Sequence, residues 1–309
     1  MNRFSRRNFL KQTAAATASV SALAAWPHRL RAESLAKSPG IQLYTVGKEL
    51  QEDLSGTLSN VAAIGYRTVE SAGLAGISAA DFRKALDAAG LKCPSSHLWV
   101  APGQTPVQYF DSVKTLGSNY VVSSVMIKPD AVIKSANDYI RIISSMTQDD
   151  FKKMAADLNT LGRQAQQAGL RFAYHNHNME FRQWSDGTTT YDTLMAETDP
   201  ALVQIELDCG WADLGGYSPQ SIFKKYPGRV RMLHIKDFVA VPMPITTLDP
   251  RTHPETTELG KGHMDYRAIL AAAPTAGVEH IFVEQEPPYV KFTALEAAKV
   301  DYDYLQSIG

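Results

Sequence analysis

Four short, mainly apolar runs in the second half of the chain each end at side chains that can bind a metal ion. They are Phe172–Tyr174 before His175 and His177, Val203–Leu207 before Asp208, Val230–Leu233 before His234, and Ile281–Val283 before Glu284. Strands of a parallel α/β sheet are buried on both faces, so a run that stops at a polar residue is typical of a strand whose carboxyl end opens into a site. If these ends converge, imidazole and carboxylate groups meet around one divalent ion.

The first 32 residues have the pattern of an export signal. Residues 5–11 read Ser-Arg-Arg-Asn-Phe-Leu-Lys, which matches the twin-arginine pattern, and a weakly apolar, alanine-rich stretch follows at Thr13–Ala25. That stretch is too short for a membrane span. We therefore expect residues 1–32 to be a cleaved signal peptide and residues 33–309 to form one domain. The protein would be periplasmic or otherwise exported, and would meet the translocation machinery and the membrane only during export.

The charge that remains after cleavage argues against nucleic acid as a partner. Removing residues 1–32 takes away six of the 31 basic residues and none of the 32 acidic ones, which leaves a formal charge near −7. Binding to phosphate backbones needs a clustered basic surface. Cys93 and Cys209 are the only cysteines, too few for a disulfide scaffold, and we expect both to be small buried residues.

The length and the order of elements predict a single (β/α)8 barrel, also called a TIM barrel. About 275 residues remain after the signal, the typical size of this fold, and no linker or low-complexity stretch divides them. Candidate strands begin near Ile41, Arg67, Leu91, Tyr120, Leu170, Leu202, Arg229 and His280. Most are followed by a segment of helical periodicity, which favours a closed barrel.

Helix ends and long connections refine this prediction. Apolar residues recur every three or four positions from Phe151 to Ala168, which predicts a helix that Gly169 ends. Gly65, Gly90, Gly117 and Gly277 stand before predicted strands in the same way, as glycines that close helices. The connections Lys128–Asp150 and Phe238–Met264 both follow a strand, so they are candidate lids over the active-site end.

An open doubly wound sheet is the main rival, because it also alternates strands and helices. Its nucleotide-binding form needs a Gly-x-Gly-x-x-Gly turn after an early strand, and the sequence has none. It also contains no P-loop, no His-Glu-x-x-His helix and no Gly-x-Ser-x-Gly elbow. We therefore expect no nucleotide cofactor.

Several motifs in strand order resemble those of the xylose isomerase-like TIM barrels, often called sugar phosphate isomerases/epimerases, and especially their exported members. The resemblance covers nearly all of the chain after the signal. It is carried by Gly40-Ile41-Gln42-Leu43-Tyr44-Thr45, Tyr174-His175-Asn176-His177 with Glu180-Phe181, Glu206-Leu207-Asp208 with Trp211, Leu233-His234-Ile235-Lys236-Asp237, Gly260-Lys261-Gly262 and Val283-Glu284-Gln285-Glu286.

The resemblance implies one divalent ion, commonly manganese, zinc, cobalt or magnesium, held by one residue from each of strands five to eight. Three ligand positions fall on Asp208, His234 and Glu284. Where many relatives have a glutamate on strand five, this chain has His175, with His177 on the same face of the strand. We expect His175 to be the fourth ligand and His177 to contact the substrate. The sequence leaves open which of the two histidines is the ligand.

Two departures from the family pattern bear on mechanism. In epimerases of this family two ligand glutamates pass a proton across the sugar, and the histidine on strand five means that this scheme does not transfer directly. Trp211 stands where apurinic-site endonucleases of the superfamily have a histidine, so the resemblance does not imply a trinuclear zinc cluster or an endonuclease.

The resemblance implies chemistry on a sugar. A divalent ion that chelates a carbonyl and its neighbouring hydroxyl stabilises the enediolate formed when a base removes the α-proton. Glu284, Glu286 or His175 is the candidate base, and Lys236 is a candidate for stabilising the oxyanion. Candidate substrate contacts are His177, His97, Glu70, Trp211 and Asp237, although Glu70 and His97 could equally stabilise loops and Trp211 could be packing.

The leading functional hypothesis is a metal-dependent isomerase or epimerase of a small sugar or keto-sugar. The first alternative is a hydratase or lyase that acts on 3-keto-glycosides or 2-hydroxy-3-keto-glycals, with chemistry like that of inosose dehydratases. An alternative of another class is a non-catalytic periplasmic sugar-binding barrel, which would have no need of the full ligand set.

Overall fold

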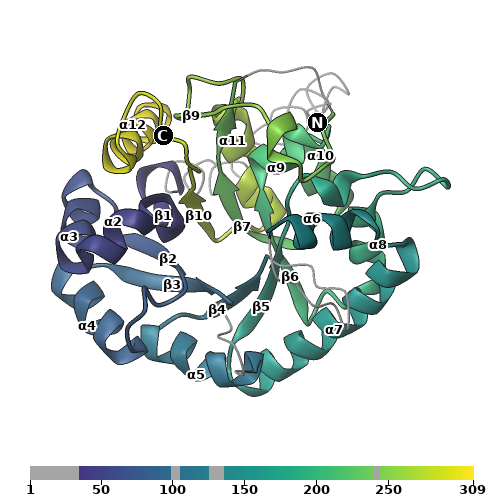
Figure 1. The fold of residues 1–309 in the computed structure, drawn as a ribbon, viewed down its shortest axis with the longest axis horizontal. Coiled ribbons are helices and arrows are strands. Elements are labelled where there is room, and N and C mark those ends of the chain that lie inside the picture. The colour runs from purple at the N-terminus through teal and green to yellow at the C-terminus, as the bar shows by residue number, and fades with distance from the viewer. Residues whose placement is uncertain (1–34, 99–104, 125–135, 240–243) are drawn as a thin grey trace, which may run out of the picture.

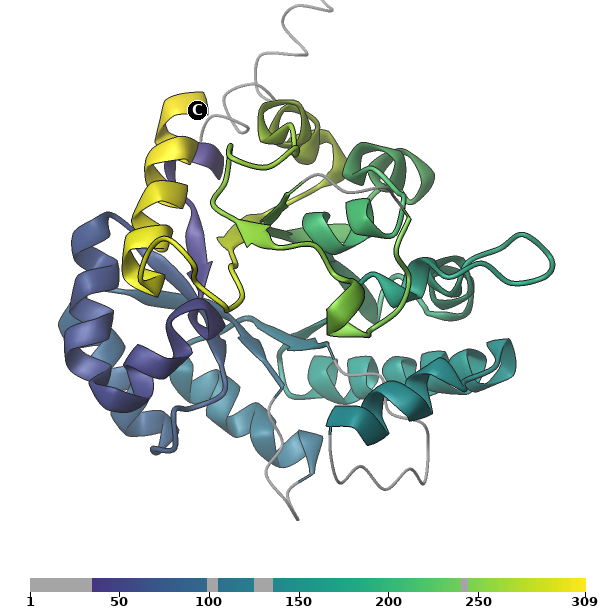
Figure 2. The same ribbon diagram turned by 45° about the horizontal axis from the view of Figure 1, so that its top comes forward.

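The computed structural model describes residues 35–98, 105–124, 136–239 and 244–309 of the chain. Within these ranges, eight parallel strands close into a barrel in the order β1-β10-β7-β6-β5-β4-β3-β2. Figures 1 and 2 show the strands at the centre and helices around them. The predicted (β/α)8 barrel is confirmed. The predicted signal peptide, residues 1–32, lies outside the described residues, and no described helix is long and apolar enough to span a membrane.

Each barrel strand begins within one residue of its predicted start. The barrel strands are β1 (Gly40–Gln42), β2 (Thr68–Ala72), β3 (Lys92–His97), β4 (Tyr120–Ser123), β5 (Arg171–His175), β6 (Val203–Asp208), β7 (Val230–Ile235) and β10 (His280–Val283). A separate antiparallel pair, β8 (Asp237–Phe238) with β9 (Thr256–Thr257), lies within the long connection that follows β7.

Helices follow the strands and cover the outside of the barrel. They are α2 (Gly47–Glu52), α3 (Leu54–Ile64), α4 (Ala79–Ala89), α5 (Pro106–Leu116), α6 (Ala136–Ser144), α7 (Gln148–Gln167), α8 (Thr190–Glu197), α9 (Cys209–Leu214), α10 (Pro219–Lys225), α11 (Tyr266–Ala276) and α12 (Ala294–Ile308). Short 3-10 turns are η1 (Leu43–Val46), η2 (Met179–Phe181) and η3 (Pro250–Thr252).

The ends of the helices follow from local sequence. Gly90, Gly117 and Gly277 close α4, α5 and α11 with φ angles of 70°, 80° and 94°, a region that only glycine enters readily. Helix α7 starts at Gln148 rather than at the predicted Phe151, because Thr147 and Asp150 form a capping box that adds a first turn. Helix α6 lies within the predicted lid Lys128–Asp150, so the described part of that connection is largely helical.

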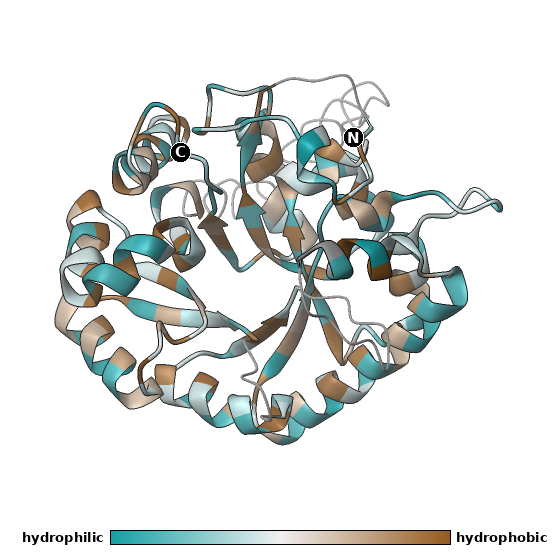
Figure 3. Ribbon diagram, in the orientation of Figure 1, coloured by the Kyte–Doolittle hydropathy of each residue, from teal (hydrophilic) through white to brown (hydrophobic). Residues whose placement is uncertain are grey.

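A layer of apolar side chains fills the barrel beneath its carboxyl end. Tyr120, Val122, Ala173, Met232 and Phe282 form this layer, which we call the barrel floor. Side chains two positions apart on a strand share a face, so the residues that follow the floor on β5, β7 and β10 also point into the barrel. Figure 3 shows brown, hydrophobic segments recurring along the strands, and teal alternating with brown along the outer helices. Cys93 and Cys209 are both buried and unpaired, as predicted.

The last helix holds a buried carboxyl group against the loop that follows β9. Asp301 on α12 accepts a hydrogen bond of 2.7 Å from the amide of Leu259, and its side chain is almost fully buried. Burial, reinforced by Glu258, raises the pKa of Asp301 to about 8. An unfolded aspartate titrates near pH 4. Since the folded value is the higher one, the stability linked to Asp301 is full below about pH 4 and is lost as the pH rises towards 8.

We therefore predict that Asp301→Asn stabilises the protein increasingly as the pH rises from 5 to 8, because the amide accepts the same hydrogen bond without having to stay protonated. The measurement is the melting temperature of the variant and of the wild type at both pH values. Asp303→Asn, on the exposed side of the same helix, is the control and should show a difference that does not change with pH. An equal effect of Asp301→Asn at both pH values would contradict the prediction.

Candidate active site

The strand ends bring the four predicted metal ligands together. His175 ends β5, Asp208 ends β6, His234 lies on β7, and Glu284 directly follows β10. One ligand atom from each of these side chains lies within 4.8 Å of all the others. The set occupies the carboxyl end of the barrel, where His175, His234 and Glu284 each stand two residues after a side chain of the barrel floor.

Glu206 lies behind these residues and contacts three imidazoles. Its Oε2 atom is 2.9 Å from Nε2 of His97, 3.1 Å from Nδ1 of His175 and 3.2 Å from Nε2 of His234. His97, His175, Glu206 and His234 form a second group that meets the distance criterion for a metal site. Glu206 was not predicted as a site residue, although its position two residues before Asp208 puts it on the same face of β6.

Glu70 on β2 lies even more deeply and does not line the pocket. Its carboxylate accepts hydrogen bonds from Nε2 of Gln42 at 2.8 Å and from the hydroxyl of Ser95, and it lies 2.5 Å from Nε2 of His234. The side chain is 0% exposed. Glu70 thus lies beneath the site, where it holds His234, and its contact with substrate stays a prediction. Gln42 and Ser95 were not predicted as site residues.

The two deep carboxylates determine which imidazole nitrogen faces the ligand set. Burial, reinforced by Glu70, raises the pKa of Glu206 to about 7. An ionised carboxylate only accepts hydrogen bonds, so in that form Glu206 takes the Nδ1 proton of His175 and leaves Nε2 as the ligand atom. Glu70 likewise takes the proton on Nε2 of His234, whose Nδ1 lies 3.1 Å from Oε2 of Glu284. We conclude that Glu206 and Glu70 orient the two histidines of the ligand set.

The two carboxylate oxygens of Asp208 have separate partners. Oδ1 accepts a hydrogen bond of 2.8 Å from the amide of Trp211 and so caps α9. Oδ2 is buried and has no hydrogen-bond partner, and its nearest cation is the ammonium of Lys236 at 3.4 Å. A buried carboxylate oxygen without a hydrogen bond is costly, and a metal ion would satisfy it. The side chains present therefore fit a divalent cation.

Lys236 contributes the positive charge next to the ligand set. Its ammonium lies 2.9 Å from Glu284, 3.4 Å from Asp208 and in contact with Glu286. Burial opposes the charge, but these carboxylates raise the pKa of Lys236 well above its usual value. Burial also raises the pKa of Asp208 to about 6, although Lys236 limits the rise. In Glu284, Lys236 and His234 outweigh burial and hold the pKa well below its usual range.

A pocket of about 190 Å³ opens above the ligand set. Its lining comes from the ends of six strands, β1 to β5 and β10, and from the residues that follow them: Gln42, Tyr44, Ala72, His97, Leu98, Ser124, His175, His177, Glu284 and Glu286. Of the predicted site residues, the lining includes His97, His175, His177, Glu284 and Glu286. His177 lies next to His175, with 5.3 Å between the ring centroids. Five of the predicted site residues thus surround the space that a substrate would enter.

The histidines of the pocket differ in charge. Burial, reinforced by Lys236, lowers the pKa of His177 to about 4, so its imidazole is neutral at pH 7. Burial also lowers the pKa of His175 well below its usual value. His97 behaves in the opposite way, because Glu70 and Glu206 outweigh burial and raise its pKa to about 10. The pocket therefore has two neutral imidazoles, His175 at the end of β5 and His177 just after it, and a protonated one, His97, on β3.

Trp211 and Asp237 were both predicted to contact the substrate, and neither is among the residues that line this pocket. Trp211 is buried between Phe238 and His253, with ring centroids at 5.0 and 5.1 Å, and the ammonium of Lys236 lies 4.8 Å from the centre of its ring. Asp237 follows the inward-pointing Lys236, so its side chain leaves the strand on the other face. In the structure, Trp211 supports the lysine from outside the pocket.

Asp237 anchors the glycine-rich loop. Its carboxylate accepts hydrogen bonds of 3.1 to 3.2 Å from the amides of Gly260, Gly262, His263 and Met264. A Cβ atom on Gly262 would lie 2.1 Å from this carboxylate, so only glycine allows so close an approach. The Gly260-Lys261-Gly262 motif is thus explained by the folding of this loop around Asp237.

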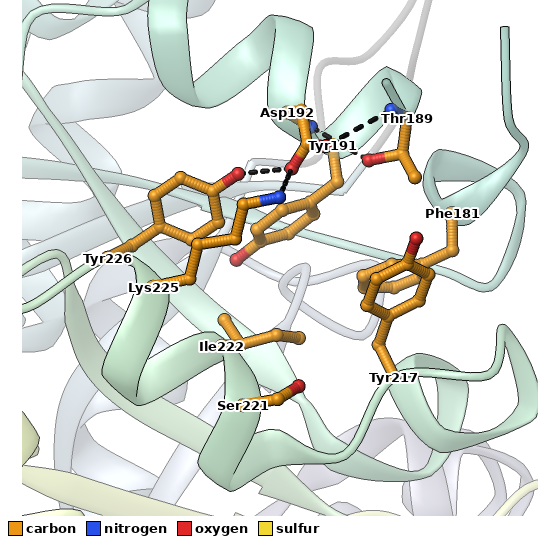
Figure 4. A pocket seen from close by; sticks show the side chains of 9 residues that line it. All are labelled: Phe181, Thr189, Tyr191, Asp192, Tyr217, Ser221, Ile222, Lys225 and Tyr226. Atoms are coloured by element: carbon orange, nitrogen blue, oxygen red, sulfur yellow. Dashed lines mark hydrogen bonds and ion pairs between the residues drawn. The ribbon is translucent and has the colours of Figure 1, made fainter. Parts of the chain in front are cut away.

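A second hollow, of about 120 Å³, lies outside the barrel and contains no group of metal ligands. It is lined by Phe181, Thr189, Tyr191, Asp192, Tyr217, Ser221, Ile222, Lys225 and Tyr226. Figure 4 shows its carboxylate, Asp192, bound to Lys225 and Tyr226. Because this charge is already paired, we place the chemistry in the barrel and not in this aromatic hollow.

Comparisons with known proteins agree with this geometry. The profile of a family described as xylose isomerase-like TIM barrel matches residues 58–308. Inosose dehydratase of Bacillus anthracis (strain CDC 684 / NRRL 3495) is 40% identical over 91 residues, 29% of this chain and 30% of that protein. Inosose dehydratase of Lacticaseibacillus casei is 29% identical over 168 residues, 52% of this chain and 55% of that protein. The matched segments thus cover between under a third and about half of the length of these curated relatives.

Solved structures share the fold over most of the chain. A sugar phosphate isomerase/epimerase from Parabacteroides distasonis ATCC 8503 has a TM-score of 0.69 and 26% identity, and the alignment covers 88% of this chain and 94% of that one. The IOLI protein, solved with a zinc atom, has a TM-score of 0.61 and 18% identity, with 88% and 97% covered. At 18% identity the second likeness concerns the fold alone.

We predict that the protein binds about one divalent ion per chain and that Asp208→Ala and His234→Ala each abolish this binding, since each removes one of four ligands. The measurement is metal content by mass spectrometry on the purified full chain. Asp192→Asn is the matched control, because it changes an aspartate in the aromatic hollow outside the barrel, and it should keep the metal. Unchanged metal content in Asp208→Ala would exclude this ligand set.

We also predict that Glu206→Ala weakens metal binding by about 10- to 100-fold, the usual cost of removing a carboxylate that orients a histidine ligand. The dissociation constant, measured by competition with a chelator, gives the effect. Glu206→Gln keeps an oxygen that can accept the Nδ1 proton of His175, so its loss should be smaller. If Glu206→Ala bound metal as tightly as the wild type, the orienting role would be wrong.

Proposed function

Because the chain belongs to the family of xylose isomerase-like TIM barrels, we propose that it is a metal-dependent enzyme that isomerises or epimerises a sugar or keto-sugar. The observation that carries this proposal is the convergence of His175, Asp208, His234 and Glu284 at the carboxyl end of the barrel. Two of the four, His175 and Glu284, also line the pocket. A protein that only binds sugar, the alternative of another class, would need no such buried ligand set. This set therefore favours an enzyme over a passive sugar-binding barrel.

The ligand set is proposed to hold manganese, zinc, cobalt or magnesium. Imidazole suits zinc, carboxylates suit manganese and magnesium, and a neighbour of the same fold was solved with zinc. When bound there, the cation would polarise the carbonyl of the substrate and stabilise the enediolate that forms after loss of the α-proton.

The residues of the pocket provide a base and an acid from different sides. Glu284 is ionised, because Lys236 and His234 keep its pKa low, and it stands at the end of β10 as the candidate base. His97 lines the pocket from β3 and carries a proton, so it can donate one to the substrate. Returning the proton at another carbon gives isomerisation, and returning it at the same carbon from the other face gives epimerisation.

Lys236 is proposed to tune the base rather than to bind the oxyanion directly. Its ammonium is buried and already faces Asp208, Glu284 and Glu286. In this position it keeps Glu284 ionised and lowers the repulsion between neighbouring carboxylates. The proposal thus gives Lys236 an electrostatic role within the site.

The substrate is proposed to be unphosphorylated. Among the described residues that line the pocket, none is a lysine or an arginine, whereas Glu284 and Glu286 are both present. A phosphate group would be repelled by these carboxylates and would lack the basic partners that usually bind it. A neutral, hydroxylated substrate fits this lining better.

Dehydration is the second candidate outcome. A hydratase or lyase would use the same enediolate, but it would expel a β-oxygen with a proton from a general acid. The protonated His97 is suited to that step, and the similarity to inosose dehydratases favours it. 3-Keto-glycosides, 2-hydroxy-3-keto-glycals and inososes would be the substrates to test.

Export through the twin-arginine pathway remains a proposal that rests on residues 5–11 and Thr13–Ala25. It agrees with an unphosphorylated substrate, because exported enzymes usually meet free saccharides. Detection of the processed protein in the periplasmic fraction, and its loss when Arg6 and Arg7 are replaced by lysine, would support export.

We predict that the metal-loaded protein exchanges the α-proton of a suitable keto-sugar with deuterated water, and that Glu284→Gln abolishes exchange because it removes both a base and a ligand. Nuclear magnetic resonance measures exchange and product together. A rearranged sugar supports isomerase or epimerase activity, and loss of water supports the dehydratase. Glu258→Gln, outside the pocket lining, is the control. Full exchange by a metal-loaded Glu284→Gln protein would exclude Glu284 as the base.

A further inference from the structure

Tyr44 is unusually exposed for an aromatic residue of this protein. Tyr44 is 49% exposed, more than any other aromatic residue whose burial is described within the ranges given above. Within those ranges its ring stacks on no other ring, and its hydroxyl makes no hydrogen bond. Exposed aromatic surface beside a pocket is typical of a place where a ligand packs.

The ring lies at the outer rim of the pocket. Tyr44 shares the lining with His175 and Glu284, and exposure rises outward from His175 at 3% through Glu286 at 30% to Tyr44 at 49%. Glu286 and Glu284 are near enough to affect the phenol, since both add to the effect of burial in raising the pKa of Tyr44. Tyr44 thus stands above the ligand set and on the path to solvent.

The backbone that carries Tyr44 is held in place from both sides. Oε1 of Gln42 accepts a hydrogen bond of 3.1 Å from the amide of Tyr44, while Nε2 of the same side chain donates to Glu70. The next residue, Thr45, accepts hydrogen bonds from the hydroxyl of Tyr289 at 2.6 Å and from the amide of Gln285 at 3.1 Å. These bonds join η1 to the loop after β10, so the ring is presented on a preorganised turn.

The whole pocket, from the ligand set out to Tyr44, has room for about one ring. Its volume is about 190 Å³, and an apolar cavity of about 150 Å³ accommodates one benzene molecule. A single pyranose placed at the ligand set would therefore fill most of this space. Any group attached to that sugar would have to extend past the rim, where Tyr44 is exposed.

We propose that Tyr44 forms an outer subsite that packs against a neutral ring attached to the reacting sugar, so that the natural substrate is a glycoside and not a free monosaccharide. This inference rests on the proposed function for the identity of the inner sugar. The ring face of Tyr44 would pack against the substituent, and Glu286 would accept hydrogen bonds from its hydroxyl groups. The carboxylates at the rim disfavour an anionic substituent.

The test compares the binding of two stable probes, D-glucose and phenyl β-D-glucoside, to the full chain saturated with Mn²⁺, by calorimetry. We expect the wild type to bind the glucoside about fivefold to tenfold more tightly, a gain in the range that aromatic packing supplies. Tyr44→Ala should reduce this preference to less than about twofold, whereas Tyr44→Phe, which keeps the ring, should retain it. Val107→Ala removes an exposed apolar side chain outside the pocket lining and should also retain it.

Three results would overturn the proposal. They are equal affinities of the wild type for the two probes, no measurable binding of the glucoside, and a preference that survives in Tyr44→Ala. The proposed function fails by a different readout, the absence of α-proton exchange in deuterated water. A preference that depends on Tyr44 in a protein without exchange would thus keep the outer subsite and reject the enzyme activity.

Discussion

The burial of four carboxylates in one end of the barrel is the constraint on which the site depends. Glu70, Glu206, Asp208 and Glu284 lie within a few ångströms of shared partners, and a buried charge is tolerated only when it is paired. The barrel provides this pairing with the buried Lys236 and with the imidazoles of His97 and His234, whose pKa values the carboxylates raise. Lys236, His97 and His234 each contact at least two of the four carboxylates, so the arrangement fixes ring orientations as well as charge. The same surplus of negative charge makes this end of the barrel suited to a cation.

The sequence was informative where local pattern decides structure, and less so where the role of a residue depends on a distant strand. Strand starts and the polar residues that end them follow from apolar runs, which explains why His175, Asp208, His234 and Glu284 could be selected. The role of Glu206 depends on its contacts with His175 of the neighbouring strand β5 and with His97 of β3, and such contacts between strands do not follow from local sequence pattern. The bonds from Asp237 to the glycine-rich loop did not follow from its sequence position either, because neighbouring residues on a strand face opposite ways.

The division between ligands and pocket lining explains why related barrels serve different reactions. The ligand set prepares a carbonyl for loss of an adjacent proton, a step that isomerases, epimerases and dehydratases share. The fate of the intermediate depends on which groups meet it from the pocket walls, here Glu286, His97 and His177. A fold seldom identifies a reaction, so the lining residues carry the information about the product.

The relation between the barrel floor and the ligand set limits how this protein can change in evolution. His234 stands two residues after Met232, and Glu284 stands two residues after Phe282. Insertion or deletion of a single residue within such a strand would turn the following side chains to the opposite face, and so displace the floor or the ligand. Insertions and deletions are therefore tolerated mainly in the loops that follow the strands. Lineages that diverge in the compounds they use should differ in loop length while the strands keep constant length.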